Sequence, residues 1–443
     1  MRRCPQRVCF QLLRYKSYPS LLLNSRPRRL QNPSFMALYT KLRHPKLHSS
    51  LLIRHLSATA TATTTTAVSP SAILSPSDSS AVLTAKQKSR AALHLLRSEN
   101  EPSRIVDICR AAALTPSSHL DRNAFSSAIS KLSSSQSFSS IRSLVDELLL
   151  SSKNPNPRFV SHAIVLFGHA GMHDDALRAF RSLPSPRSLN ALLFACIISN
   201  NHSELAKIFR EYPTIYGVSP DLETYNTVIK SFAESGTTRS FYSVFDEMLK
   251  IKIKPNSTTF CNALEGFYKE QRFDDVEKVL ELMRKHDCNP GVSTYNVRIL
   301  GLTKLGKLEQ AKELFGEMLK KKVNPSWVSY SYLIVGFCKE GNLEEAKRFY
   351  KSMRSKGCVA ESWVYFSLMN YLCKGGDFEA ALGVCKDTMV RNWVPCFASM
   401  KLLVNGLASS SKVDEAKDLI EKVKERFPKG TDMWKEVEEG LLK

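Results

Sequence analysis

Several sequence features that mark enzymes, membrane proteins and nucleotide-binding proteins are missing from this chain of 443 residues. It has no run of 18 or more apolar residues, about the length that a membrane-spanning helix requires. The phosphate-binding pattern GxxxxGK followed by Ser or Thr, a GxGxxG turn and the zinc-binding pattern HExxH are also absent. We therefore expect a protein that is not an enzyme and has no cofactor, no membrane contact and no small-molecule substrate.

Paired or clustered cysteines are missing as well. The eleven cysteines form no CxxC pair and no cluster with histidine, so we expect structural thiols rather than disulfides or a zinc site. His169 and His173 are four residues apart, but they bracket Gly171 at an expected turn, and we predict no metal site there. Four of the cysteines lie in regular helical segments, where half-buried thiols are common: Cys338, Cys358, Cys373 and Cys385.

Acidic residues are absent from the first 77 positions, which contain twelve lysines or arginines. Arginines alternate there with apolar pairs, serines are frequent, and the single apolar block of a secretory signal is missing. This composition is typical of an organellar transit peptide, which we place at residues 1–57. The early arginines favour the mitochondrion, with the chloroplast as the alternative. A second interpretation is a basic arm that stays attached and binds nucleic acid.

The formal net charge of +21 is concentrated in this segment, because removal of residues 1–57 lowers it to +9. The mature protein is therefore moderately basic, and a polyanionic partner remains plausible. Residues 58–82 are rich in Ala and Thr and then in Ser and Pro, which predicts a disordered linker. Helical periodicity starts near Leu83 and predicts a degenerate helix pair at residues 83–121.

A repeated pattern dominates residues 222–361, with an interval of 35 residues. A period between 20 and 50 residues is the signature of a solenoid, in which each repeat packs against its neighbours. The pattern extends over residues 122–431 as about nine units, and residues 432–443 are expected to form a capping helix. The residues on the common lattice are Pro220, Pro255, Pro290 and Pro325, together with Gly236, Gly306 and Gly341.

Each unit is predicted to be a helical hairpin, as residues 292–326 illustrate. Tyr295, Ile299 and Leu302 recur at helical spacing, and Gly306 follows where a left-handed cap belongs. The apolar face of a second helix comes next. That face consists of Leu308, Ala311, Leu314, Phe315 and Met318, and small residues recur at the phase of Ala311 in Ala346, Ala381 and Ala416.

The repeated phrases resemble the pentatricopeptide repeat family, in its plain 35-residue form from plant organelles. Tetratricopeptide repeats, which bind peptides, are the nearest rival, but their period is about 34 residues and their signature differs. The resemblance implies an all-α fold, a right-handed superhelical α-solenoid that holds RNA. It is carried by Thr224-Tyr225-Asn226, Thr294-Tyr295-Asn296, Cys338-Lys339-Glu340-Gly341, Cys373-Lys374-Gly375-Gly376, the Phe-x-Glu-Met segments at residues 245–248 and 315–318, and the closing prolines.

The resemblance also implies that the fifth and last residues of a unit read one RNA base. Asn190 with Asp221 would favour uracil. Asn226 with Asn256, and Asn296 with Ser326, would favour pyrimidines. Ser126 with Asn156 would favour adenine. Short amide, hydroxyl and carboxylate groups can bond to a base edge and stay hydrated when the site is empty.

Other units depart from this code. The pairs Cys261/Gly291, Ser331/Glu361, Phe366/Cys396 and Lys401/Thr431 are not readable, nor is the short unit at residues 157–185. The second position of most units is polar, whereas the family tends to place an apolar residue there to sandwich bases. Stacking on a base contributes about 1–3 kcal/mol, so sequence-specific binding to a long RNA is not expected.

A row of lysines follows the same lattice at the end of the first helix in four successive units. These are Lys269, Lys304, Lys339 and Lys374, each 35 residues after the last. They could follow a phosphate backbone. Alternatively, lysine at a helix C-terminus is simply favoured by the helix dipole.

The family and the layout together suggest a function in mitochondrial RNA biology. The chain resembles a small group of plant family members associated with the mitochondrial ribosome, which implies ribosomal RNA or mRNA and ribosomal subunit proteins as partners in translation. A free factor that stabilises, processes or helps translate one transcript is the alternative. A protein-binding helical scaffold is a second alternative.

Overall fold

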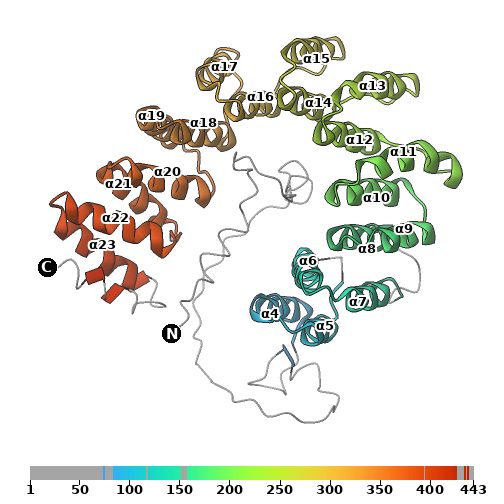
Figure 1. The fold of residues 1–443 in the computed structure, drawn as a ribbon, viewed down its shortest axis with the longest axis horizontal. Coiled ribbons are helices and arrows are strands. Elements are labelled where there is room, and N and C mark those ends of the chain that lie inside the picture. Colours follow the sequence, from blue (N-terminus) through green and yellow to red (C-terminus); the bar gives the residue numbers. More distant parts are fainter. Residues whose placement is uncertain are drawn as a thin grey trace. The chain divides into compact units, whose positions relative to one another are not determined.

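The computed structural model describes residues 73–74, 83–115, 118–150, 157–393, 395–426, 434–435 and 437–438. These residues contain twenty α-helices, one short 3₁₀ helix and no strand (Figure 1). The prediction of an all-α repeat fold is confirmed. The proposed transit peptide, residues 1–57, lies outside the described residues, as do most of the linker and of the capping segment.

The helices come in pairs with short turns inside each pair. The N-terminal pair is α4 (Ala85–Ser98) with α5 (Pro102–Ala111). The following pairs are α6 (His119–Ser134) with α7 (Phe138–Leu150), α8 (Pro157–Ala170) with α9 (His173–Ser182), and α10 (Pro186–Ile198) with α11 (His202–Tyr216). Next come α12 (Leu222–Ser235) with η1 (Thr238–Ser240) and α13 (Phe241–Lys250), α14 (Ser257–Lys269) with α15 (Phe273–Lys285), and α16 (Val292–Lys304) with α17 (Leu308–Lys320). The last pairs are α18 (Trp327–Glu340) with α19 (Leu343–Ser355), α20 (Ser362–Lys374) with α21 (Phe378–Val390), and α22 (Phe397–Ser409) with α23 (Val413–Arg426).

The starts of the first helices coincide with the unit starts placed on the sequence lattice, from Pro157 at α8 to Phe397 at α22. The first unit differs. Its helix α6 begins at His119, three residues before the expected Arg122, because Ser118 forms the N-cap and accepts a bond from the Asp121 amide at 3.0 Å. A serine cap satisfies one of the free amide groups of the first turn, and this local bond outweighs the lattice spacing.

The turns between paired helices use left-handed residues, as the glycine lattice predicted. Gly306 has a φ of 72° and Gly341 a φ of 86°. After α16 the amide of Lys307 donates to the Leu302 carbonyl at 2.9 Å, which closes the exposed end of the helix. The equivalent position after α14 holds Gln271 with a φ of 59°, so the geometry persists without glycine.

The core lies between the two layers of helices, and it includes the face predicted for residues 308–318. All five residues of that face in α17 are buried. Ala311, Ala346 and Ala381 have no exposed surface, as expected where two helices cross closely. Phe315 meets Tyr330 of the next unit edge-on, with ring centroids 5.1 Å apart, and so joins successive hairpins.

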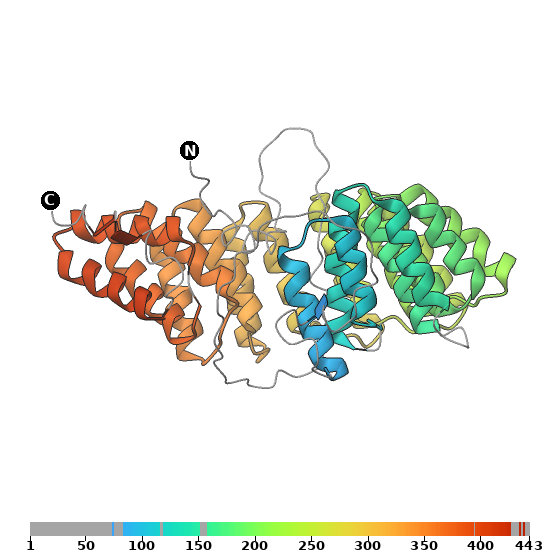
Figure 2. The same cartoon turned by 90° about the horizontal axis from the view of Figure 1, so that it is seen from below.

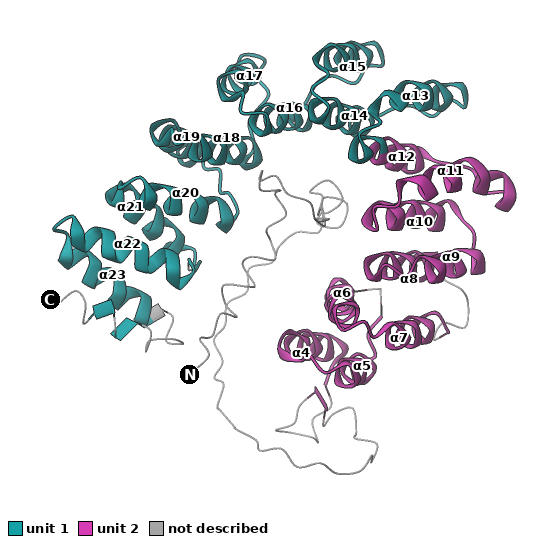
Figure 3. Cartoon of the chain, viewed as in Figure 1, with its two compact units in different colours: residues 1–20, 232–443 teal, residues 21–231 magenta. Residues whose placement is uncertain are grey.

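The structure divides into two compact units, residues 21–231 and residues 1–20 with 232–443 (Figure 3). Each is built from the same hairpins. In the second of them, the first helices α14, α16, α18, α20 and α22 contact one another in chain order, so successive hairpins lie side by side (Figure 2). This stacking places equivalent positions of neighbouring units next to each other.

The described helices include none that is both long and apolar enough to cross a membrane. The nine cysteines of the described residues are all free thiols. Burial raises the pKa of Cys338 and of Cys385 to about 12, which keeps both as unreactive thiols at neutral pH.

Candidate nucleic-acid interface

The predicted base-reading residues lie at the junctions between units. The fifth residue of a unit lies in the second turn of its first helix. The last residue precedes the first helix of the next unit and serves as its N-cap: Asn256 caps α14 and Ser326 caps α18. Asp221 does the same before α12, where its carboxylate accepts the Thr224 amide at 2.9 Å. A reading pair therefore spans two successive helices.

Asn190 and Asp221 form the most completely bonded of these pairs. The amide nitrogen of Asn190 donates to the Asp221 carboxylate at 3.0 Å. Its amide oxygen accepts the hydroxyl of Thr224 at 2.6 Å. Thr224 has no exposed surface and Asn190 is 5% exposed, so water cannot replace these bonds. The buried hydroxyl thus fixes which end of the Asn190 side chain faces Asp221.

Asn296 and Ser326 repeat the arrangement three junctions later. Asn296 donates from its amide nitrogen to the Ser326 hydroxyl at 3.4 Å, and it accepts the Ser329 hydroxyl at 2.6 Å. Ser329 is fully buried. Two pairs with different last residues therefore share one orientation of the asparagine amide.

The structure describes less of the other two predicted pairs, Asn226 with Asn256 and Ser126 with Asn156. Asn226 is half-buried on α12, and Asn256 exchanges cap bonds with Thr259 at the start of α14. Ser126 is exposed on α6, whereas Asn156 lies outside the described residues.

The orienting hydroxyl, which we name the junction hydroxyl, was not found by sequence reasoning. It belongs to the third residue of the following unit and is fully buried in each case. The sequence did contain a signal for this hydroxyl, because a Ser or Thr recurs there at intervals of 35 residues. The junction hydroxyls are those of Thr224, Thr259, Thr294 and Ser329.

Units that depart from the code also depart from this geometry. Cys261 lies 3.9 Å from the Thr294 hydroxyl, so a thiol replaces the amide there. Ser331 donates instead to the Trp327 carbonyl of its own helix at 2.7 Å, and the next unit offers the apolar Val364 at the third position. Cys396 approaches Ser399 at 3.3 Å, within its own cap. These junctions lack an oriented amide.

The four lysines of the predicted row are exposed at the ends of α14, α16, α18 and α20. Lys269 donates to the carbonyls of Ala233 and Glu234, at 3.4 and 2.6 Å, and so caps the first helix of the preceding unit. The Lys374 ammonium lies 5.9 Å from the centre of the Tyr371 ring. Lys269 therefore has a structural role that the sequence lattice did not indicate.

Charges at the second positions also meet across a junction. Desolvation and the nearby Asp221 carboxylate raise the pKa of Glu223, whereas the Arg187 guanidinium lowers it. Arg187 and Glu223 belong to the units on either side of Asp221. This junction therefore carries two carboxylates and one guanidinium beside the Asn190 pair, and it is more acidic than the Asn296 junction.

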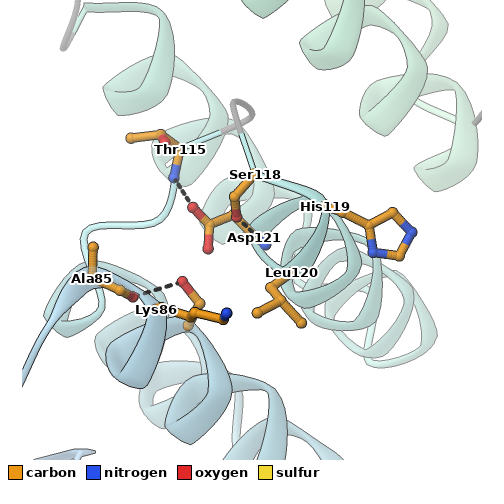
Figure 4. Close-up of a pocket in the computed structure, with 8 residues that line it drawn as sticks. Ala85, Lys86, Thr115, Ser118, His119, Leu120 and Asp121 are labelled. Atoms are coloured by element: carbon orange, nitrogen blue, oxygen red, sulfur yellow. Dashed lines mark hydrogen bonds between the residues drawn. The ribbon is translucent and has the colours of Figure 1, made fainter. Parts of the chain in front are cut away.

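A hollow of about 430 Å³ lies near the N-terminal pair, apart from these junctions (Figure 4). Asp121 lies at its edge and accepts the Thr115 amide at 3.1 Å, which ties the loop before α6 to that helix. Lys86, Ser89, Ser118 and His119 also line it. No group of three or more His, Cys, Asp or Glu residues in the described parts of the chain is arranged to hold a metal ion.

Sequence models of the PPR repeat family match residues 220–269, 290–339 and 328–374. Those of the pentatricopeptide repeat domain and the PPR repeat match residues 261–303 and 398–426. A mitochondrial pentatricopeptide repeat-containing protein of Arabidopsis thaliana is 57% identical over 367 residues, covering 81% of this chain and 91% of that protein. The chain belongs to the pentatricopeptide repeat family.

Two further similarities extend this comparison within the family. The small ribosomal subunit protein mL103 of Arabidopsis thaliana is 30% identical over 183 residues, which cover 40% of this chain and 44% of that protein. The crystal structure of the pentatricopeptide repeat protein PPR10 from maize aligns at 17% identity with a TM-score of 0.40, covering 79% of this chain and 60% of that one. The predicted mitochondrial location is confirmed, because the relative at 57% identity and two other relatives are mitochondrial proteins.

Proposed function

We propose that this pentatricopeptide repeat protein binds RNA through its unit junctions and works with the mitochondrial ribosome in translation. The observation that carries RNA binding is the orientation of Asn190 and Asn296 by a junction hydroxyl. Each amide carries a second N–H besides the one used inside the junction, and this group can donate to a base oxygen. An oriented donor repeated along a solenoid suits successive bases of one strand.

Association with a ribosome is supported by two features. The similarity to the ribosomal protein mL103 covers 40% of the chain. The oriented junctions are interrupted at Ser331 and Phe366, which favours holding an RNA by its backbone and shape over reading a long sequence. Catalysis is not part of the proposal, and the protein acts by binding alone.

Sedimentation of a mitochondrial lysate tests the ribosomal part of the proposal. After nuclease digestion of mRNA, the protein is expected to sediment with a ribosomal subunit. A shift to light fractions would instead favour the free transcript factor. Release by high salt together with other proteins but without RNA would favour the protein-binding scaffold.

Binding of purified full chain to unstructured RNA tests the junctions. Asn190→Ala combined with Asn296→Ala is expected to weaken binding by about 10-fold, because two oriented donors are lost. Ser130 and Ser143, which lie on α6 and α7 away from these junctions, provide a matched control as Ser130→Ala with Ser143→Ala. Equal affinity of both double variants would show that the junctions do not bind RNA.

The lysine row has a separate test. If Lys269, Lys304, Lys339 and Lys374 all neutralise phosphates, changing the four to Gln makes the salt dependence of single-strand binding shallower by about 3. An unchanged slope would leave the four lysines as helix-end residues only.

A further inference from the structure

Every hairpin unit has two edges, because its second helix runs back antiparallel to the first. One edge carries the turn between the two helices. The other carries the end of the second helix, the linker and the start of the next unit. A helix of 13 residues, such as α14, is about 20 Å long, so the edges are well separated. We define the linker edge as residues 249–256, 284–291, 319–326 and 354–361, and the turn edge as residues 233–240, 268–275, 303–310 and 338–345.

The two edges differ sharply in charge although they belong to the same four units. The linker edge holds ten lysines and arginines and two acidic residues, a net charge of +8. The turn edge holds six basic and eight acidic residues, a net charge of −2. Three of the lysines in the predicted row lie on this acidic turn edge. The basic surface of the repeats is therefore on the opposite edge.

Seven of the eight lysines of the linker edge are also unengaged. All ten basic side chains there are exposed. Within the described residues, Lys321 pairs with Glu317 at 2.7 Å and Arg354 with Asp387 at 3.0 Å. Seven lysines have neither an ion pair nor a hydrogen bond to a described residue: Lys250, Lys252, Lys254, Lys285, Lys320, Lys322 and Lys356.

Basic groups of the turn edge are held by their own protein. Arg272 pairs with Asp275, Lys307 lies 4.0 Å from the centre of the Phe273 ring, and Lys269 caps α12. An engaged cation must give up its partner before it binds a phosphate. The seven unengaged lysines of the linker edge carry no such cost.

Two successive linker segments, residues 249–256 and 284–291, lie against one another, so their lysines share one surface. The Cys288 thiol donates to the Pro255 carbonyl of the preceding segment at 3.7 Å. An open hollow of about 300 Å³ lies between these two segments, and Lys252, Lys254 and Lys285 line it together with Asp287. Each segment ends at a last-position residue, so the basic surface adjoins the junctions and includes Asn256 and Ser326, but not the fifth-position asparagines Asn226 and Asn296.

The linker edge can bind phosphates but cannot stack bases. Its four segments contain no Phe, Tyr or Trp. The ring of His286 is engaged edge-on with Phe245, at 5.3 Å between centroids. Proteins that hold unpaired bases use exposed aromatic rings, whereas double-helical RNA offers mainly its phosphates and sugars. Lysine, a flexible point charge, suits such contacts.

We propose that the linker edge of residues 249–361 binds the phosphate backbone of a double-helical RNA segment. Its lysines are separate from the fifth-position residues that the proposed function assigns to a single strand. It rests on the proposed function only in that both partners are RNA. The protein would then hold an unpaired strand and an adjacent stem of a folded RNA at the same time.

The test compares two RNAs and two variants of the full chain. The RNAs are a hairpin with a 20-base-pair stem of arbitrary sequence and an unstructured 20-nucleotide strand, followed by fluorescence anisotropy at several KCl concentrations. The edge variant changes Lys250, Lys254, Lys285 and Lys320 to Gln. The matched control changes Lys207, Lys278, Lys351 and Lys386, which are exposed on second helices away from the edge. Circular dichroism and thermal melting verify that both variants fold.

The edge variant is expected to bind the hairpin at least about 10-fold more weakly than the control, with a salt dependence shallower by about 3.6, because each duplex phosphate contact contributes about 0.9. Its affinity for the unstructured strand should change less than about 3-fold. Hairpin affinities of the two variants within about 2-fold of each other would overturn the inference. So would an equal loss for both RNAs, because the edge would then follow the single strand.

Two outcomes for the unmodified protein separate this inference from the proposed function. Binding of the strand without binding of the hairpin would overturn the inference alone. Binding of neither RNA would reject the proposed function as well. Binding to vesicles of phosphatidylserine and phosphatidylcholine, lost in the edge variant, without any hairpin binding would assign the edge to a lipid surface instead.

Discussion

The junction hydroxyl of Thr224 gives the Asn190 amide its orientation, and it can be removed with little change in shape. Thr224→Val should leave the Asn190 oxygen without its buried donor, at a cost of about 1–3 kcal/mol in stability, while the Asp221 carboxylate keeps the backbone amide of residue 224. It should also abolish the base preference at one RNA position. Selection from a random RNA library measures this preference. Thr227→Val is the control, because Thr227 bonds only to the Glu223 carbonyl of its own helix at 2.8 Å. Equal loss of preference in both variants would contradict the assigned role.

His162 provides a pH-dependent prediction. Burial, with the nearby charges of Arg122 and His169, lowers its pKa to about 4. The ordinary pKa of 6.5 applies in the unfolded chain, so that state binds the proton first. Stability should therefore be constant above pH 6.5 and fall as the pH drops towards 4, by about 1 kcal/mol at pH 5.5. Urea unfolding of the wild type and of His162→Gln at pH 7.5 and 5.5 measures it, and the variant should lose less stability on acidification.

At the scale of residues, sequence reasoning placed the predicted reading pairs at the unit junctions but did not find the bonds that hold their side chains. The positions of Asn190 and Asp221 followed from family resemblance and the lattice. The third member of the network, Thr224, was missed because its role depends on the next unit's first turn. The bond from Lys269 to the preceding helix depends on how two hairpins are offset, and no local pattern encodes that offset.

The second helix of each unit packs an apolar face into the core. Helix α17 contains one buried and one exposed leucine, so this face can be tested within a single helix. Leu314 is 5% exposed whereas Leu319 is 48% exposed. Leu314→Ala should therefore lower the free energy of unfolding by about 2–5 kcal/mol. Leu319→Ala should change it by less than about 0.5 kcal/mol. Chemical denaturation of both variants measures the difference, and similar midpoints would contradict the assignment of this face.

Gly168 marks a close approach of two first helices, α8 and α10. A Cβ atom on Gly168 of α8 would lie 2.6 Å from the Ala195 Cβ and 2.8 Å from its Cα on α10. Because backbone must move, Gly168→Ala should destabilise the protein by about 1–3 kcal/mol. Gly316 of α17 has no heavy atom within 4 Å of such a Cβ. Gly316→Ala should instead stabilise by about 0.5–1 kcal/mol, and opposite shifts in melting temperature are the expected result.

Element boundaries were largely predictable because proline and cap residues mark them directly in the sequence. Pro157 and Pro186 each begin a helix, where a missing amide hydrogen carries no penalty. The start of α6 was wrong because its cap, Ser118, is a local signal outside the period. The repeat length therefore predicts the spacing of the units, whereas short-range hydrogen bonds determine where each helix begins and ends.

The positive charge of the whole molecule is concentrated in two regions, residues 1–57 and the linker edge. Removal of residues 1–57 lowers the net charge from +21 to +9, and the linker edge alone carries +8. Residues 1–57 joined to a fluorescent protein should direct it to mitochondria. Changing Arg2, Arg3, Arg7 and Arg14 to Gln should leave the fusion in the cytosol, because organellar import signals depend on such basic residues. Confocal microscopy distinguishes these outcomes, and import of the substituted fusion would contradict the assignment.

The sequence contains the charged residues of both edges, but it does not show that they lie on separate surfaces. Counting along the chain mixes the two edges, because they alternate every few residues. Only the antiparallel hairpin separates Lys250 and Lys285 from Glu270 and Asp274 in space. The solenoid thus converts an alternating linear pattern into two surfaces of opposite character.

The junction hydroxyl also bears on how such chains could be recombined. Because Asn190, Asp221 and Thr224 come from two successive units, a 35-residue block cut at a helix start does not contain its own complete reader. In a chimaera, the junction hydroxyl that orients the asparagine of a transplanted block would belong to the block that follows it. Grafts that exchange residues 191–225 rather than 186–221 would move Asp221 and Thr224 together and leave Asn190 behind. Inheritance of base preference in a chimaera should therefore follow the pair of adjoining blocks and not either block by itself.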